Sequence, residues 1–282
     1  MQNELTLQQI HDVELEALIF FDRLCKEQNL QYALTWGTLL GSIRHKGFIP
    51  WDDDVDVWMP RADYNRFIEY CYNNESTIYP YKLCGRDNTK NYKYSIYRVS
   101  DQRYKYVSNI VESDNPDIGV FIDVYPVDKF SNNIIERKYV ETKITLINIF
   151  YSIYIDGQSY SGYGIKSTIK RTVHAILNRV YGKDYDQRVN HRIYETIKRH
   201  QRDTSSYIGA PGWENKYLFF SRDVIDSGIT MGEFEGYFFC IPKEWHNVLE
   251  TTYGDYMVLP PEKDRVPNHG YKIIARSKMN GE

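Results

Sequence analysis

Four aspartates fall within five consecutive positions of this 282-residue chain; they are Asp52, Asp53, Asp54 and Asp56. Neighbouring like charges repel one another by about 1 kcal/mol per pair even in bulk water, and a bound cation is a common relief. Because Asp54 and Asp56 flank Val55, a β-strand would place both carboxylates on one face and the valines in the core. Two carboxylates on one face suit a hard divalent ion such as Mg²⁺ or Mn²⁺. The spacing therefore predicts a catalytic metal site.

Three other interpretations compete with a catalytic metal site. A solvated acidic loop is common, but it seldom alternates with valines. A calcium loop of the EF-hand type needs Gly and Glu where a count from Asp52 gives Val57 and Asp63. A glycosyltransferase Asp-x-Asp motif usually follows a complete nucleotide-binding half, and only about 50 residues precede this one, which is room for one or two α/β units.

A further carboxylate, Asp123, stands among Val, Phe and Ile in the apolar run 119–126. An unpaired carboxylate on such a buried strand is costly. We predict that Asp123 faces Asp54 and Asp56, as a third metal ligand or as a general base. The alternative is a carboxylate satisfied by the backbone or by a helix cap. Asp128, which follows a proline, is expected in a loop or cap.

Composition limits the classes of function. The net charge of −3 and the pI near 6.2 argue against a general nucleic-acid binder. No signal peptide and no run of about 18 apolar residues is present, so we expect a soluble, cytoplasmic protein. The cysteines show no metal-binding spacing and are expected to be reduced thiols; they are Cys25, Cys71, Cys84 and Cys240.

Hydrophobic periodicity predicts alternating helices and strands. A capping box at Thr6 and Gln9 starts the first helix, which runs to about Leu24 as a scaffold. Further helices are expected over 39–45, 61–74, 132–156, 165–181, 185–202 and 243–253. Strands are expected over 31–35, 54–59, 81–83, 94–100, 104–107 and 119–126, with 217–220 and 236–241 as a returning pair. The segment 157–164 is expected to be a loop.

The small-residue turn at Gly37 and Thr38 leads into the predicted helix 39–45. Such a turn offers free backbone N–H groups to phosphate. Arg44, at the end of this helix, is placed either to meet phosphate or to form a salt bridge with the aspartates. Gly47 is expected to cap the helix.

The predicted helices 165–181 and 185–202 are rich in Arg and Lys. Charge runs of this kind usually form a solvated helix face. A basic helical layer that approaches a polyanionic acceptor is the alternative.

Four blocks of the sequence, in this order, resemble the LicD family, which includes bacterial phosphocholine transferases and is similar to fukutin and fukutin-related protein. The resemblance covers most of the chain, but the segment from about 132 to 206 carries no recognisable motif. The blocks are Trp36–Arg44, 47–56, 122–128, and the tail formed by 253–256, Pro260, Pro261 and His269.

The resemblance implies an α+β fold of the nucleotidyltransferase type, with a small mixed sheet, flanking helices and metal carboxylates from two neighbouring strands. We expect one domain over 1–282, with 132–206 as a helical insertion. In the wider superfamily a Gly-Ser pair precedes Asp-x-Asp by about a dozen residues. The pair 41–42 fits that spacing, whereas the family block points to Gly37 and Thr38, which we adopt. With Arg44, Asp52 and His269, these two residues are the predicted substrate- and phosphate-binding residues.

The resemblance also implies a reaction, in which a CDP-linked alcohol passes its phospho-alcohol group to a hydroxyl of a cell-surface glycan and CMP is released. CDP-choline is the expected donor, and a glycolipid acceptor would bring the protein to the inner face of the membrane. Ribitol phosphate or glycerol phosphate transfer, a sugar-nucleotide glycosyltransferase and a catalytically inactive binding module remain alternatives. A choline head group would need aromatic faces; Trp36, Trp51, Trp58 and Tyr125 lie near the motifs, although each also suits the core.

Overall fold

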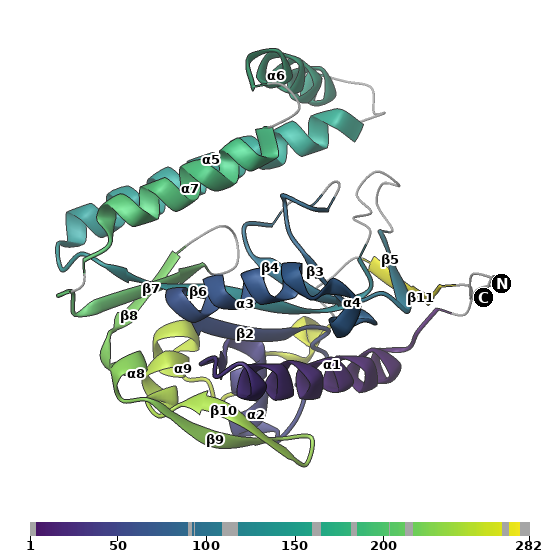
Figure 1. Ribbon diagram of the computed structural model, residues 1–282, viewed down its shortest axis with the longest axis vertical. Helices are drawn as coiled ribbons and strands as arrows, with labels where there is room; N and C mark the ends of the chain where they lie inside the picture. Colours follow the sequence, from purple (N-terminus) through teal and green to yellow (C-terminus); the bar gives the residue numbers. More distant parts are fainter. Residues whose placement is uncertain are drawn as a thin grey trace.

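The structure is a computed structural model that describes residues 4–89, 92, 94–108, 118–159, 165–181, 185–202, 204–211, 217–266 and 271–276. It has an α+β fold with a mixed sheet at its centre and helices around it, as predicted (Figure 1). None of the helices in these described ranges combines the length and the hydropathy needed to span a bilayer.

The central sheet joins strands that are far apart in the sequence. Its path is β1 (Ala33–Leu34), β2 (Val55–Pro60), β6 (Val120–Phe130), β4 (Tyr97–Asp101) and β3 (Tyr81–Cys84). β2 and β6 are parallel, whereas the other neighbours are antiparallel. The far end of β6 pairs with β7 (Tyr207–Pro211), which pairs in turn with β8 (Tyr217–Ser221).

Helices bury the apolar positions of this sheet. α1 (Leu7–Glu27) begins at the predicted capping box, in which Thr6 accepts from the Gln9 amide. Its Phe21 packs edge-on against Phe67 of α3 (Arg61–Asn73), and both side chains are fully buried in the main core. Val55 and Val57 of β2 are buried in the same core, as the alternation with Asp54 and Asp56 predicts. The short α4 (Glu75–Ile78) follows α3.

Two small sheets complete the body. The β9 (Ile229–Phe234) and β10 (Tyr237–Pro242) hairpin packs beside α2 (Trp36–Arg44), with α8 (Asp223–Asp226) and α9 (Trp245–Tyr253) nearby. β5 (Tyr104–Ser108) pairs with β11 (Tyr271–Ala275), after the short 3-10 helix at Glu262–Asp264.

The helical segment forms a layer of its own at one end of the molecule. α5 (Ile134–Ser159) and α7 (Tyr185–His200) run side by side, and α6 (Ile165–Tyr181) lies farthest from the sheet (Figure 1). A second buried cluster, which includes Phe130, Val140, Ile144 and Val189, fastens this layer to the end of β6. The mainly helical character predicted for 132–206 is thus observed, although β6 continues to Phe130 and β7 begins at Tyr207.

Several predicted boundaries were wrong. Helix α2 begins at Trp36, three residues early, so the expected phosphate turn is its first turn. The left-handed residue after α2 is Lys46, with φ +61°, so Gly47 is not the cap; Gly47 lies so close to the Glu235 side chain that a Cβ there would collide with it. α5 continues to Ser159, which makes the start of the expected loop 157–164 helical.

The predicted pairing of 217–220 with 236–241 was also wrong. The first segment pairs with β7 and the second with β9, because each finds its antiparallel partner directly before it in the chain. The predicted helix 243–253 begins at Trp245, and Pro242 ends β10 rather than entering the helix. The predicted strand 104–107 pairs with the tail strand β11, which had not been predicted.

Candidate metal centre

Strands β2 and β6 bring together the three carboxylates that the sequence singled out. Asp56 and Asp123 are direct partners in the parallel register, and Asp54 stands immediately before β2. One oxygen from each of Asp54, Asp56 and Asp123 lies within 4.8 Å of the other two. Asp56 and Asp123 are buried, whereas Asp54 is half-buried, so the cluster has one open side.

The cluster has the properties of a cation site. The Asp56 Oδ1 atom is buried and has no hydrogen-bond partner among the described residues, which is costly for a carboxylate unless a ligand completes it. Burial, followed by Asp54 and Asp123, raises the pKa of Asp56 well above its usual range, although the Tyr125 hydroxyl donates a hydrogen bond to it. An all-oxygen donor set of this kind fits Mg²⁺ or Mn²⁺.

The first turn of α2 holds Asp56 in place. The Thr35 amide donates to the Asp56 carbonyl at 3.1 Å, and the Asp56 amide donates to the Thr38 hydroxyl at 2.8 Å. Between these two contacts Trp36 has a φ of +44°, a left-handed conformation that is uncommon for a residue with a side chain. This tight turn allows the segment from Thr35 to Thr38 to form hydrogen bonds with both the carbonyl and the amide of Asp56. Thr38, which the sequence predicts to bind phosphate, therefore also fixes the position of β2, the strand that carries Asp56.

Gly37 and Asp52 are in direct contact. A Cβ at Gly37 would collide with the Asp52 Oδ2 atom, so glycine allows this carboxylate to lie against the start of α2. The Asp52 carbonyl is also within hydrogen-bond distance of His11 Nε2 on α1, at 2.7 Å. Gly37 and Asp52, two of the predicted substrate-binding residues, thus lie close to Asp56 of the cluster.

The alternative pair, Gly41 and Ser42, lies against β9 and the loop at Gly47. The Ser42 hydroxyl is fully buried and donates to the Glu233 carbonyl of β9 at 2.8 Å. A Cβ at Gly41 would collide with the Gly47 carbonyl. These two residues pack α2 against the hairpin, so the geometry favours Gly37 and Thr38 as the family position.

Arg44 extends to the C-terminal segment. Its guanidinium donates to the Tyr256 carbonyl at 2.7 Å and to His45 at 2.9 Å, and burial lowers its pKa. Tyr253, in the same tail block, has a hydroxyl whose pKa is raised by burial and then by Asp56, Asp52 and Asp54. Arg44 thus fastens the tail segment that brings Tyr253 to the aspartates. The predicted His269 lies outside the described residues.

Arg98 was not predicted from the sequence as a residue of this site. This buried residue of β4 is the register partner of Asp123, and its guanidinium grips both carboxylate oxygens, with Nη2 at 3.1 Å from Oδ2. The guanidinium also lies 3.8 Å from the ring centroids of Tyr94 and Phe121. An arginine at a strand position of an otherwise apolar, aromatic segment was the available signal. The Asp123 carboxylate is satisfied by Arg98, rather than by the backbone or a helix cap.

Glu14 was missed as well, because it stands in a helix that reads as a scaffold. It is 1% exposed, and within the part of the chain that the structure describes its Oε2 atom has no hydrogen-bond partner. Burial raises its pKa well above the usual range, and Asp54, Asp53, Asp52 and Asp123 raise it further. The available signal was a glutamate at helical spacing from Ile10 and Ala17, on the apolar face of the helix.

Asp128 corrects the expectation of a loop or cap residue. It is a buried residue of β6, and Arg61 grips both of its oxygens at 2.7 and 2.6 Å. Gln201 adds a third hydrogen bond at 2.8 Å. The apolar run simply continues past the proline, and Asp128 anchors α3 and the end of α7 to the strand.

The chain matches known proteins over almost its whole length. The nucleotidyltransferase domain described as LicD/FKTN/FKRP matches residues 29–149. The lipopolysaccharide cholinephosphotransferase LicD of Haemophilus influenzae is 30% identical over 278 residues, covering 94% of this chain and 97% of that protein. An uncharacterized protein of Rickettsia prowazekii is 30% identical over 122 residues, covering 40% of this chain and 44% of that protein. The chain belongs to the LicD family and is a phosphotransferase enzyme.

Proposed function

We propose that this enzyme transfers phosphocholine from CDP-choline to a hydroxyl of a lipopolysaccharide-type glycan and releases CMP. The observation that carries the proposal is the cluster of Asp54, Asp56 and Asp123, in which the buried Asp56 Oδ1 atom has no partner among the described residues. The Haemophilus relative is a lipopolysaccharide cholinephosphotransferase, which supports choline as the transferred alcohol and lipopolysaccharide as the acceptor.

In this proposal Asp54, Asp56 and Asp123 hold a divalent cation, Mg²⁺ or Mn²⁺. When bound, the cation neutralises charge on the donor diphosphate. Arg98 fixes the orientation of Asp123, and the first turn of α2 fixes Asp56. Preorganised charges of this kind stabilise a phosphoryl-transfer transition state without moving during the reaction.

The proposed transfer forms one P–O bond, breaks another and moves one proton. The acceptor hydroxyl oxygen forms a bond to the phosphorus that carries choline. The bond between that phosphorus and the bridging oxygen of the diphosphate breaks, and CMP leaves with the bridging oxygen. A carboxylate of the cluster accepts the hydroxyl proton.

The choline ammonium needs an aromatic face. Trp36 and Trp58 are buried in the core and pack edge-on against each other, so their rings serve packing. Trp51 is half-buried, directly precedes Asp52, and already has the Arg265 guanidinium 5.7 Å from its ring centroid. Trp51 is therefore the aromatic ring proposed to meet the choline ammonium, in place of the Arg265 guanidinium.

The test is a CMP-release screen in Mg²⁺ with CDP-choline, CDP-ribitol, CDP-glycerol and CDP-ethanolamine, each with a glycan acceptor. We expect CDP-choline to be used and EDTA to abolish the reaction. Use of CDP-ribitol or CDP-glycerol alone would replace choline by another alditol. Donor binding without CMP release would indicate an inactive binding module, and turnover of a sugar nucleotide would indicate a glycosyltransferase.

A further inference from the structure

We propose that the outer surface of the helical layer binds an anionic lipid bilayer and so brings the enzyme to a membrane-embedded glycolipid acceptor. This inference rests on the proposed function for the identity of the acceptor. It rests on α5, α6 and α7 for the binding surface, which is separate from the metal centre.

The first observation is an exposed apolar stripe on α6. Ile169, Ile176 and Val180 are 56%, 56% and 62% exposed, and their spacing places them on one helix face. Exposed single hydrophobics are ordinary, but a row of them along one face of a helix indicates a binding surface.

The second observation is a matching stripe on α5, next to α6. It has the same spacing along the helix and consists of Ile135, Tyr139, Leu146 and Phe150, all exposed. A groove of about 530 Å³ lies where α5, α6 and α7 meet, and Leu146, Phe150 and Leu177 contribute apolar walls to it. A groove of this volume and lining can hold part of an acyl chain.

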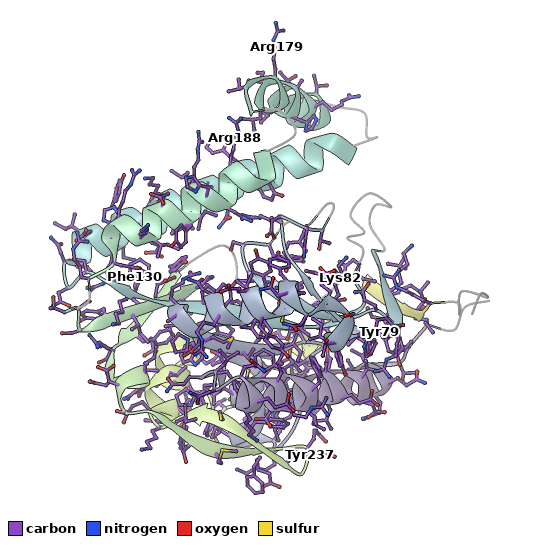
Figure 2. The ribbon with its side chains drawn as sticks, viewed as in Figure 1. Tyr79, Lys82, Phe130, Arg179, Arg188 and Tyr237 are labelled. Carbon is purple, nitrogen blue, oxygen red and sulfur yellow. The ribbon has the colours of Figure 1, made fainter. Side chains whose placement is uncertain are left out.

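The third observation is the charge. Residues 165–200 contain nine lysines and arginines against three aspartates and glutamates, although the whole chain has a net charge of −3. Lys143 and Arg192 line the groove itself. Arg179 on α6 and Arg188 on α7 are exposed, and Figure 2 shows both side chains projecting outward from the helical layer.

An apolar stripe flanked by cations is the arrangement with which amphipathic helices lie in a membrane interface. The apolar side chains enter the headgroup boundary, and each nearby Lys or Arg gains about 1 kcal/mol from anionic lipid. The positive charge of this surface is complementary to an anionic bilayer rather than to an apolar protein surface. The metal centre, in contrast, is acidic.

The helical layer is also connected to the metal centre. The Tyr151 hydroxyl of α5 donates to the Tyr92 carbonyl at 3.1 Å, and Arg86 joins Asn148 of α5 at 3.1 Å. The Tyr92 ring lies 6.0 Å from the guanidinium of Arg98, which grips Asp123. A layer fastened at these points holds the catalytic body at a fixed position relative to the bilayer.

The test is co-sedimentation of the purified full-length protein with vesicles of phosphatidylcholine alone or with phosphatidylglycerol added. The variant Ile169→Glu/Ile176→Glu removes apolar contact and adds repulsion at exposed positions. The control Tyr237→Glu/Phe238→Glu changes two exposed aromatics of the β9–β10 hairpin, and Figure 2 shows Tyr237 at the opposite end of the molecule.

We expect the wild type and the control to bind vesicles that contain phosphatidylglycerol, and the α6 variant to bind at least about tenfold more weakly. About 0.5 M NaCl should weaken wild-type binding, because salt screens the cations. Thermal unfolding of both variants should match the wild type, since only exposed side chains change.

Equal binding of the wild type and the α6 variant would overturn the proposal, as would the absence of binding to anionic vesicles. A concentration-dependent dimer that the α6 variant dissolves would overturn it in favour of a second copy as the occupant. Failure of the proposed function is distinguishable, because it would abolish CMP release with every acceptor and leave vesicle binding unchanged.

Discussion

The metal centre and the helical layer differ in almost every physical property. Around the metal centre, Asp56, Asp123 and Glu14 are buried and gripped by hydrogen bonds or left with an unpartnered oxygen. In the helical layer, side chains such as Ile176 and Arg188 are exposed. One region concentrates negative charge in a rigid sheet, and the other spreads positive charge over an apolar surface. Under the two proposals above, reaction chemistry and acceptor capture belong to separate parts of the chain.

The largest expected effect comes from Asp56→Asn. Loss of this carboxylate should lower Mg²⁺-dependent CMP release by a factor on the order of 10²–10³. The fold should survive or gain stability, because one buried like charge is removed. Steady-state CMP release and thermal unfolding check both expectations.

Asp53→Asn is the control, since Asp53 is outside the three-carboxylate cluster. We predict activity within about threefold of the wild type for this variant. Full activity of Asp56→Asn in Mg²⁺ would remove Asp56 from the account.

The next effect is that of Arg98→Lys. A lysine keeps the charge but cannot grip both oxygens of Asp123, so the metal ligand loses its fixed orientation. We expect a loss of about 10–100-fold in metal affinity, with a matching fall in turnover. Calorimetric titration with Mn²⁺ measures the affinity.

The chain offers a matched control in Arg61→Lys, because Arg61 makes the same two-oxygen contact with Asp128 on the same strand. That change should reduce thermal stability and leave metal affinity nearly unaltered. If the two variants lost metal affinity equally, the role of Arg98 would be merely structural.

A smaller effect concerns pH and Glu14. The folded state raises the pKa of Glu14, so it holds this proton more tightly than the unfolded chain does. That contribution to stability is fully present below the unfolded value of about 4.3 and is lost as the pH rises through the higher folded value. Asp56 acts with the same sign in the metal-free protein.

The metal-free wild type should therefore unfold at a lower temperature at pH 8 than at pH 5. Glu14→Gln should reduce this difference by raising the unfolding temperature at pH 8 only. Scans at several pH values in EDTA measure it. An unchanged pH profile in Glu14→Gln would show that Glu14 is not the group responsible.

The smallest effect belongs to the helical layer. With a water-soluble glycan acceptor, Ile169→Glu/Ile176→Glu should release CMP within about twofold of the wild type, because both residues are exposed surface positions of α6. CMP release in the absence of vesicles measures this. A large loss would mean that the two regions are not separate in function.

The sequence predicted the three-carboxylate cluster of Asp54, Asp56 and Asp123 better than its surroundings. Alternation around Val55 and a lone carboxylate at Asp123 are local signals, and the parallel pairing of β2 and β6 brought them together. Arg98 and Glu14 each stand out locally as a charge in an apolar segment, but only long-range packing joins them to the cluster, and no spacing in the sequence shows that connection. They became visible once β4 and α1 were placed in space.

The fold shows the same limit. Capping at Thr6 and the amphipathic helices are set by residues a few positions apart, and they were predicted nearly correctly. The pairing of β11 with β5 joins segments more than 160 positions apart, and pairing of that kind depends on the whole topology. The early start of α2 depends on the left-handed conformation of Trp36, which the conformational preference of tryptophan does not predict.

The most direct test of the central claim is the binding of Mn²⁺ to the purified protein, followed by electron paramagnetic resonance in the absence of donor. If Asp54, Asp56 and Asp123 form the metal centre, the wild type should bind the ion and Asp56→Asn should bind it at least about tenfold more weakly. Equal binding by the two proteins would contradict the account, because the cation would then be held elsewhere.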